Sequence, residues 1–228
     1  MITVFVHGAG CTSRVFREQL AAFPESIAVT LPGRTGVPGT PESIEAFADA
    51  LEPQLRPLER VLLCGSSMGG AIALELALRT RAYVAGVLLL GSGARLRVAP
   101  ALFERLENDF AAGARSLADS FFAHPQPELV EDAFAEMLDV GREQTIRDFR
   151  ACDAFDVTGR AASLHVPLLA LTGDADVLTP PKFAQWFADR VPGAEARIVP
   201  GAGHLAMIER PDETNAAIRA FARQIDAD

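Results

Sequence analysis

The sequence has little positive charge and no long apolar run. Its 21 Lys and Arg residues are outnumbered by 30 Asp and Glu residues, which gives a formal net charge of −9. Nucleic acids and anionic membranes bind clustered positive charge, so we expect neither as a partner. No apolar run approaches the roughly 18 residues that a bilayer-spanning helix needs. The composition therefore favours a soluble protein.

Cysteine is also scarce. Cys11, Cys64 and Cys152 are an odd number and lack the short spacing of metal ligands, so we expect no disulfide framework and no metal site. Met1 leads directly into "ITVFV", which lacks the length and the basic flank of a secretory signal. Both observations favour a reduced, cytoplasmic protein. Nothing in the sequence calls for an organic cofactor.

Short apolar runs alternate with amphipathic segments along the chain. The runs at 2–6, 27–31, 60–64, 86–90, 167–171 and 196–200 are apolar without alternation, which is typical of strands that are buried on both faces. The segments at 13–23, 42–55, 68–80, 181–191 and 212–225 have helical periodicity. This alternation predicts an α/β protein with a mostly parallel sheet of about six strands and helices on both faces.

Residues 95–165 interrupt this alternation. They contain four helical patterns, at 101–112, 116–123, 127–138 and 143–155, and no convincing strand. The usual connection in such a fold has about 2–6 residues, so this block predicts a helical lid inserted into a core of residues 1–94 and 166–228. The alternative is a helical layer that packs on the sheet without gating the site.

The stretch "GSSMG" at 65–69 lies between a predicted strand and a predicted helix. It matches G-x-S-x-G with Ser67 at the centre, whereas Ser66 does not have glycine on both sides at the required spacing. In a nucleophile elbow such glycines let neighbouring backbone pass close to a strained serine. Ser67 is therefore the candidate nucleophile.

A serine hydroxyl needs a base to remove its proton. The chain has four histidines, at His7, His124, His165 and His204. His204 lies in a glycine-rich loop between the last predicted strand and the last helix, so it can reach Ser67 at the carboxyl edge of the sheet. The imidazole in turn needs a carboxylate, and the loop after the 167–171 strand offers Asp174 and Asp176.

Two backbone N–H groups are needed to stabilise the oxygen that becomes negative during acyl transfer. We expect one from Met68, directly after the candidate nucleophile, and one from Ala9 in the "HGAG" loop after the first strand. His7 in that loop is expected to brace it. The same loop, read as "GAGCTS", begins like a dinucleotide-binding fingerprint, but Ser13 replaces its third glycine and no acidic residue ends the second strand.

Five segments together resemble the α/β-hydrolase superfamily, and within it the small lid-bearing serine esterases. They read "VFVHGAG", "LPGR", "GSSMGG", "LTGDADVLTPPKFAQWFADRVPGA" and "VPGAGHLAMIERPDETNAAIRAF", and they span nearly the whole chain. In this family the acid precedes three residues and a proline, as Asp176 precedes Pro180. The resemblance therefore implies Asp176 as the triad acid and leaves Asp174 to brace its loop.

Two features depart from the family pattern. Relatives usually carry an antiparallel hairpin before the first motif strand, and here that hairpin is missing, which implies a sheet of about six strands. The loop after the second strand reads "TLPGRTG", where many relatives have "DLPGHG", so different substrate contacts are expected there.

The sequence thus predicts a carboxylesterase-type serine hydrolase that forms an acyl-enzyme with small to medium acyl esters. Ser67, His204 and Asp176 form the triad, and phenylalanines of the 95–165 block supply an apolar pocket wall. The same triad could instead catalyse lactone or C–C hydrolysis, perhydrolysis or an elimination. An elimination on an anionic substrate needs pocket arginines, for which Arg95, Arg97, Arg105 and Arg115 are the candidates. A non-catalytic receptor is the remaining alternative, disfavoured because all three triad residues are present. The oligomeric state, monomer or homodimer, is left open.

Overall fold

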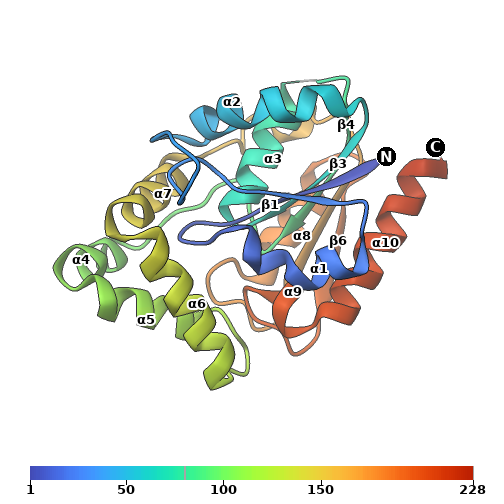
Figure 1. Cartoon of the computed structure of the whole chain (residues 1–228). Coiled ribbons are helices and arrows are strands. Elements are labelled where there is room, and N and C mark those ends of the chain that lie inside the picture. The colour runs from blue at the N-terminus through green and yellow to red at the C-terminus, as the bar shows by residue number, and fades with distance from the viewer. Residues whose placement is uncertain (80, 228) are drawn as a thin grey trace.

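The computed structural model describes residues 1–79 and 81–227, which are built around one six-stranded sheet (Figure 1). The strands are β1 (Ile2–Val6), β2 (Ile27–Val29), β3 (Val61–Ser66), β4 (Val84–Leu90), β5 (Leu168–Gly173) and β6 (Glu195–Val199). Their order is β2-β1-β3-β4-β5-β6, and every neighbouring pair is parallel. The predicted α/β architecture with six strands is confirmed.

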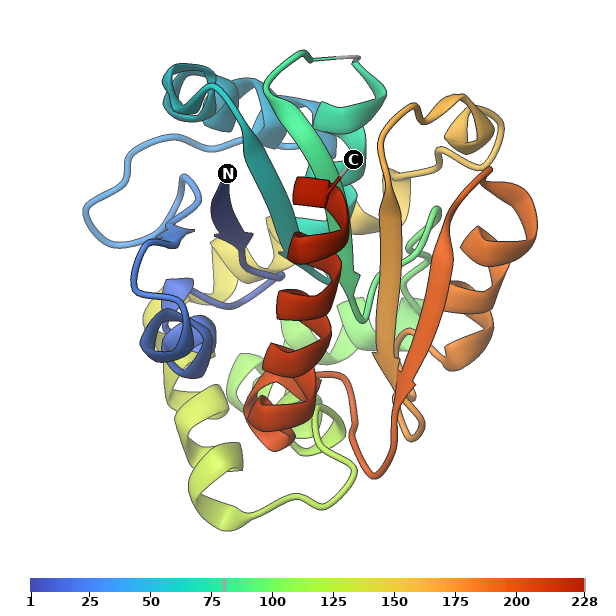
Figure 2. The same ribbon diagram turned by 90° about the vertical axis from the view of Figure 1, so that its right-hand side faces the viewer.

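Helices cover both faces of the sheet. One face carries α2 (Ile44–Leu55), α3 (Met68–Leu78) and α8 (Pro181–Arg190), and the other carries η1 (Ser13–Phe16), α1 (Arg17–Ala22) and α10 (Pro211–Ala227). Figure 2 shows α10 in front of the sheet, running roughly along the strands. Successive residues of β3 point to opposite faces, so Leu63 packs with α2 and α3 whereas Leu62 and Cys64 pack toward α10. This explains why the strand sequences are apolar without alternation.

The order of the strands places two loops next to each other. β1 is followed along the chain by β2 on one side, and it pairs with β3 on its other side. In the β1–β3 register Val6 lies opposite Gly65, so both strands end at the same level. The loop at 7–12 therefore meets the turn that contains Ser67. Ligands of parallel α/β sheets bind at such a reversal of strand order.

The segment between β4 and β5 is helical, as predicted. It contains α4 (Pro100–Asn108), α5 (Phe110–Ser120), α6 (Pro127–Val140) and α7 (Arg142–Ala154), which Figure 1 shows gathered on one side of the molecule. The single helix expected at 101–112 is divided, because the Asp109 side chain accepts a hydrogen bond from the Ala112 N–H at 3.0 Å and begins a new helix. The short α9 (Ala206–Glu209), directly after His204, was not predicted.

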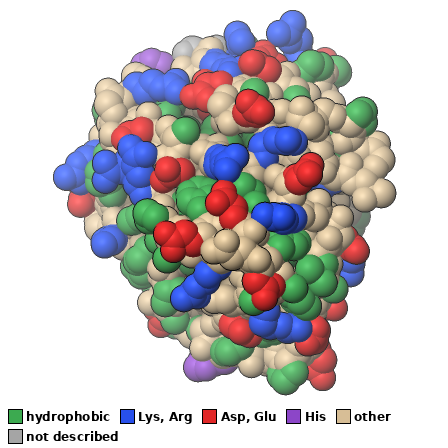
Figure 3. Space-filling model, turned by 90° about the vertical axis from the view of Figure 1, so that its left-hand side faces the viewer, with side chains coloured by type: hydrophobic (Ala, Val, Ile, Leu, Met, Phe, Trp, Pro, Cys, Tyr) green, Lys and Arg blue, Asp and Glu red, His purple; other side chains and the backbone are tan. Residues whose placement is uncertain are grey.

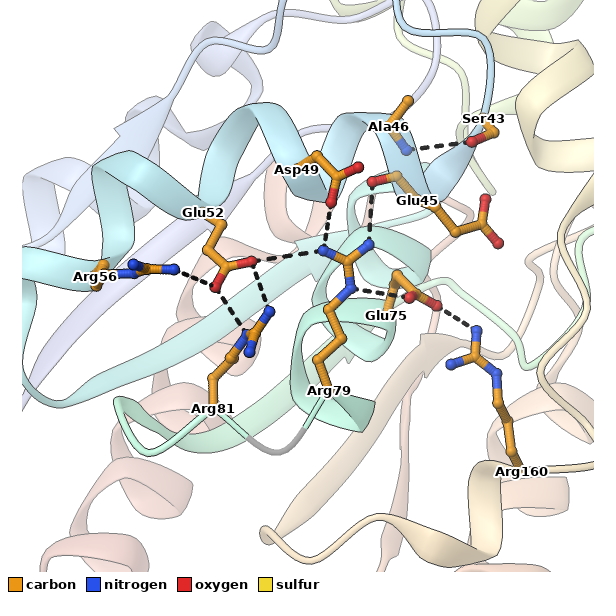
Figure 4. Close-up of polar contacts among 10 residues, drawn as sticks. All are labelled: Ser43, Glu45, Ala46, Asp49, Glu52, Arg56, Glu75, Arg79, Arg81 and Arg160. Atoms are coloured by element: carbon orange, nitrogen blue, oxygen red, sulfur yellow. Dashed lines mark hydrogen bonds and ion pairs between the residues drawn. The ribbon is translucent and has the colours of Figure 1, made fainter.

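A network of ion pairs fastens this segment and α2 to α3 (Figure 4). Arg79 at the end of α3 donates to Glu75 at 3.0 Å and to Asp49 of α2 at 2.7 Å. The buried Glu75 also pairs with Arg160, which lies between α7 and β5. Since α3 follows Ser67, the network holds the helix behind the candidate nucleophile against two neighbouring elements.

Within residues 1–79 and 81–227, no helix combines the length and the apolar character needed to cross a bilayer.

Candidate functional site

Ser67 adopts a strained backbone conformation at the turn between β3 and α3. Its φ is 51° and its ψ is −115°, a region that residues with a side chain rarely occupy. A Cβ on Gly65 would overlap the Gly69 carbonyl oxygen, and one on Gly69 would overlap the Val6 carbonyl oxygen. Both glycines of the motif are therefore required by close backbone approach. Ser66 is the last residue of β3 and lies outside the turn.

Hydrogen bonds to residues at and after the end of β4 also hold the Ser67 turn. The Ser67 N–H donates to the Leu90 carbonyl at 2.9 Å, and the Ser92 hydroxyl donates to the Ser67 carbonyl at 2.8 Å. Both partners belong to the end of β4 and the loop after it. The strained conformation thus depends on the neighbouring strand, which no local pattern around residue 67 indicates.

His204 and Asp176 form a buried pair. Nδ1 of His204 lies 2.9 Å from Oδ2 of Asp176, and the two side chains are 5% and 0% exposed. Oδ1 of Asp176 accepts hydrogen bonds from the N–H groups of Leu178 at 2.9 Å and Thr179 at 2.8 Å. Burial alone would raise the pKa of Asp176, but His204 and the Thr179 hydrogen bonds outweigh it and lower the pKa to about 2. Asp176 is therefore a carboxylate at neutral pH and can orient the imidazole.

The other acidic and histidine candidates lie elsewhere. The Asp174 carboxylate accepts a hydrogen bond from the Gly201 N–H at 2.8 Å, so it braces the neighbouring loop as expected. His124 and His165 are exposed and do not line the cavity that contains Ser67. His7 is completely buried, and burial followed by the nearby Arg34 lowers its pKa to about 3. Its ring makes hydrogen bonds with the Gly8 carbonyl and the Leu31 N–H, both at 3.0 Å. A neutral imidazole makes both bonds, so His7 holds the two loops together, as expected.

The residues expected to bind an oxyanion flank the Ser67 turn. A Cβ on Gly8 would lie 3.3 Å from the Ser67 Cβ, which shows how closely the 7–12 loop approaches the turn. Among the described residues the Ala9 N–H has no hydrogen-bond acceptor. Met68 is the first residue of α3, where backbone N–H groups have no acceptor within the helix. Both amides are available to a substrate oxygen.

One cavity of about 410 Å³ is bordered by several of these groups, although Met68 and Asp176 are not among its lining residues. Ser67, His204 and Ala9 line it, and the helical insertion supplies much of the remaining wall. Its apolar side chains are Leu96, Val98, Leu102, Leu117, Phe121, Phe149, Val177, Leu178, Phe183 and Leu205. Of the seven phenylalanines in the insertion, Phe121 and Phe149 reach the cavity. Of the four arginines considered for an anionic substrate, Arg97 does.

The loop that carries His204 is clamped to the insertion by Glu209, which sequence reasoning missed. The Glu209 carboxylate accepts hydrogen bonds from the N–H groups of Gly203 at 2.7 Å, Ala123 at 3.0 Å and His124 at 2.8 Å. The Leu205 N–H donates to the Phe121 carbonyl at 3.1 Å. No spacing rule links residue 209 to 123, so no signal in the sequence could have indicated this contact.

A second, more open hollow of about 1200 Å³ lies between residues 33–42 and α7. Its charged lining includes Arg142, Arg147 and Arg150 but also Glu42 and Glu107, and none of the candidate catalytic residues reaches it. Figure 3 views the side of the molecule where α4 and α7 lie in Figure 1, and basic and acidic side chains are interspersed there. In the part of the chain that the structure describes, no group of three or more His, Cys, Asp or Glu side chains could hold a metal ion.

Comparison with known proteins identifies the family. Residues 3–217 match the model described as "Alpha/beta hydrolase family". The chain is 28% identical to a pimeloyl-[acyl-carrier protein] methyl ester esterase of Aromatoleum aromaticum, over 96% of this chain and 97% of that protein. A solved thermophilic esterase matches 98% of this chain and 90% of its own, with a TM-score of 0.90 and 28% identity. Est816, described as an N-acyl homoserine lactone degrading enzyme, matches 97% of this chain and 93% of its own, with a TM-score of 0.86 and 27% identity.

Proposed function

Because the chain belongs to the alpha/beta hydrolase family, we propose that it cleaves carboxylic esters with Ser67 as nucleophile, His204 as general base and Asp176 as the residue that orients His204. The observation that carries this proposal is the buried His204–Asp176 pair, at 2.9 Å, in a site where His204 shares one cavity with Ser67. The positive φ of Ser67 supports it, since such strain is retained where the surrounding structure enforces it and is common at active sites.

The chemistry follows from these positions. Nε2 of His204 takes the proton from the Ser67 hydroxyl while Oγ attacks the ester carbonyl carbon. The carbonyl oxygen becomes negative and is stabilised by the N–H groups of Ala9 and Met68. Collapse of the intermediate expels the alcohol, which takes the proton from His204. A water molecule, deprotonated by the same imidazole, then hydrolyses the acyl-enzyme and regenerates the Ser67 hydroxyl.

The cavity defines the substrate class. Its volume of about 410 Å³ and its aliphatic and aromatic wall suit an uncharged acyl chain of small to medium length. The relatives named as methyl ester esterases indicate a small alcohol as the leaving group. We therefore propose methyl or comparably small esters of short to medium acyl groups as substrates.

Lactone opening is a second candidate. The 27% identity and TM-score of 0.86 to a lactone-degrading enzyme favour it over the other triad-dependent reactions. A lactone is an internal ester, so the same nucleophile and oxyanion donors serve, and the alcohol stays attached to the acyl group.

The proposal also includes a role for the helical insertion and a cellular compartment. The helical insertion at 95–165 acts as a lid, since its Leu102, Leu117, Phe121 and Phe149 close one side of the cavity. The cytoplasm is the proposed compartment, because Cys11, Cys64 and Cys152 are buried free thiols.

The test is turnover of a p-nitrophenyl ester series from acetate to palmitate, with N-acyl homoserine lactones in parallel. We expect the highest kcat/KM at a short or medium chain length, and at least a roughly 10³-fold loss of kcat in Ser67→Ala. Folding of the variant is checked by circular dichroism. Equal turnover by Ser67→Ala, or no turnover of any ester or lactone by the folded wild type, would refute the proposed function.

A further inference from the structure

A buried ion pair joins the loop after β2 to the helical insertion. Arg34 lies in the turn at 33–37 and Asp148 lies on α7, and their side chains are 1% and 0% exposed. Nη2 of Arg34 is 2.5 Å from Oδ2 of Asp148, and Nη1 is 3.2 Å from Oδ1. Burying two charges is costly, so such a pair needs good geometry and partners for its remaining polar atoms.

The remaining donors of Arg34 bind backbone carbonyls. Nε donates to Cys11 at 3.1 Å, Nη1 to Pro32 at 3.1 Å and Nη2 to Gly8 at 3.5 Å. All five N–H groups of the guanidinium are thereby used. Two of the three carbonyls belong to the 7–12 loop, so Arg34, at the position where many relatives have histidine, is hydrogen-bonded to that loop. Arg34 is not among the residues that line the cavity.

Asp148, the partner of Arg34, also binds the 7–12 loop. Its Oδ2 accepts a hydrogen bond from the Gly10 N–H at 3.0 Å, and its Oδ1 accepts one from Gln144 at 2.8 Å. A second carboxylate of the insertion, Glu136 on α6, accepts from the Thr12 N–H at 2.8 Å and from the Thr12 hydroxyl. The loop is therefore anchored to α6 and α7 at two positions.

These anchors fix the direction of one particular amide. The Gly8 carbonyl, which lies 3.5 Å from Nη2 of Arg34 and 3.0 Å from Nδ1 of His7, shares one planar peptide group with the Ala9 N–H, so holding the carbonyl also orients the N–H. The Ala9 carbonyl and the Gly10 N–H form the next peptide group, which Asp148 holds. Both peptide planes next to Ala9 are thus restrained, while its N–H stays without an acceptor among the described residues.

We propose that Arg34 and Asp148 are positioning residues that direct the Ala9 N–H toward the oxyanion and make this direction depend on the placement of α7. The proposal rests on the proposed function, because the Ala9 amide has this role only if an oxyanion forms beside Ser67. Displacement of α7 would release the 7–12 loop. The pair of N–H donors for the oxyanion is therefore complete only when the helical insertion is packed on the core.

The test compares the full-length wild type with Arg34→Met and with the double variant Arg34→Met/Asp148→Leu. Apolar replacement of both partners is expected to restore much of the stability that the single change removes. If the pair positions Ala9, kcat for p-nitrophenyl butyrate falls by about 100-fold in both variants while KM changes by less than about threefold, because the loss concerns the transition state. Recovery of kcat together with stability in the double variant would overturn the proposal.

Arg150→Met is the matched control, since Arg150 also lies on α7 but its pair with Glu107 is 66% and 43% exposed. A readout independent of activity is amide hydrogen exchange of residues 8–12, followed by mass spectrometry. We expect faster exchange in both Arg34 variants and wild-type exchange in the control. Unchanged exchange at 8–12 would refute the anchoring, whereas lack of ester turnover by the wild type would refute the proposed function, so the two failures are distinguishable.

Discussion

The Thr179 hydroxyl lies 2.7 Å from Oδ2 of Asp176, the same carboxylate oxygen that His204 contacts. The Thr179 N–H also donates to Oδ1 of Asp176, and the hydroxyl is 3.1 Å from Nδ1 of His204. One residue therefore restrains both oxygens of the carboxylate and, through them, the orientation of the imidazole. In the sequence Thr179 is only one of the three residues between Asp176 and Pro180.

Replacing Thr179 by valine keeps the backbone hydrogen bond and removes the hydroxyl. We expect kcat to fall by about 10-fold, because a hydrogen bond to a carboxylate contributes about 1.5 kcal/mol or more. KM should change little, since valine keeps the side-chain volume where residue 179 lines the cavity and the lost hydroxyl contacts Asp176 and His204. The measurement is steady-state hydrolysis of a p-nitrophenyl ester, with the exposed Thr158→Val as control. An unchanged kcat would show that the Thr179 hydroxyl does not orient the pair.

Glu209→Gln should loosen the loop that carries His204. A neutral amide has one acceptor oxygen, so one or two of the three N–H groups at positions 123, 124 and 203 would lose their partner. We expect a loss of about 1–3 kcal/mol in the free energy of unfolding and a severalfold lower kcat. Urea unfolding and ester turnover test this, and the exposed Glu213→Gln is the control. A Glu209→Gln variant as stable as that control would contradict the clamp.

Ser67→Gly should abolish activity but leave the protein more stable than Ser67→Ala does. Glycine adopts positive φ without steric cost, whereas serine and alanine are strained at φ 51°. The strain of about 1–3 kcal/mol exceeds the entropic cost of glycine, about 0.4–1 kcal/mol, so Ser67→Gly should be about 1 kcal/mol more stable than Ser67→Ala. Both variants should be inactive. Urea unfolding monitored by circular dichroism measures the difference, and greater stability of the alanine variant would mean that the turn is not strained.

His7 should make stability fall at acid pH. Its pKa is about 3 in the folded protein and about 6.5 in an unfolded chain, so below pH 6.5 the unfolded state binds a proton that the folded state does not. The free energy of unfolding should therefore decrease as the pH falls, by about 1 kcal/mol from His7 between pH 6.5 and 5.5.

Urea titrations at pH 7.5, 6.5 and 5.5 test this on the wild type and His7→Asn. The variant should be less stable at pH 7.5, because the bonds to Leu31 and Gly8 change, but its stability should decline less steeply with acid. The exposed His165→Asn should keep the wild-type slope. Equal slopes for the wild type and His7→Asn would show that folding does not lower the pKa of His7.

Much of the fold could be predicted because its signals are local. Each strand is buried on both faces, so runs such as "VLLC" at 61–64 are apolar throughout, and the helices between them keep one apolar face. The division of the first insertion helix at Asp109 escaped prediction. An aspartate within a helical pattern and an aspartate that begins a new helix look alike until the position of the next turn is known.

The sequence by itself also determined which residues are candidates for the chemistry. Ser67 follows β3, Asp176 follows β5 and His204 follows β6, and parallel strands bring their carboxyl ends to one edge of the sheet. A motif next to each strand end was therefore enough to propose Ser67 and His204 and to limit the acid to Asp174 or Asp176, whereas the choice of Asp176 came from the resemblance to the α/β-hydrolase superfamily.

Only the tertiary structure decided what holds these candidates in place. Asp148 lies 138 residues from Gly10 and 114 from Arg34, and Glu209 lies 86 from Ala123. Such bonds depend on which distant loops come together when the sheet forms. A buried acceptor then binds a donor that lies near it in space, whatever their separation along the chain. Neither periodicity nor motif spacing encodes that proximity. The candidate reactive groups can therefore be identified along the chain, whereas the groups that hold them in place appear only when the chain is folded.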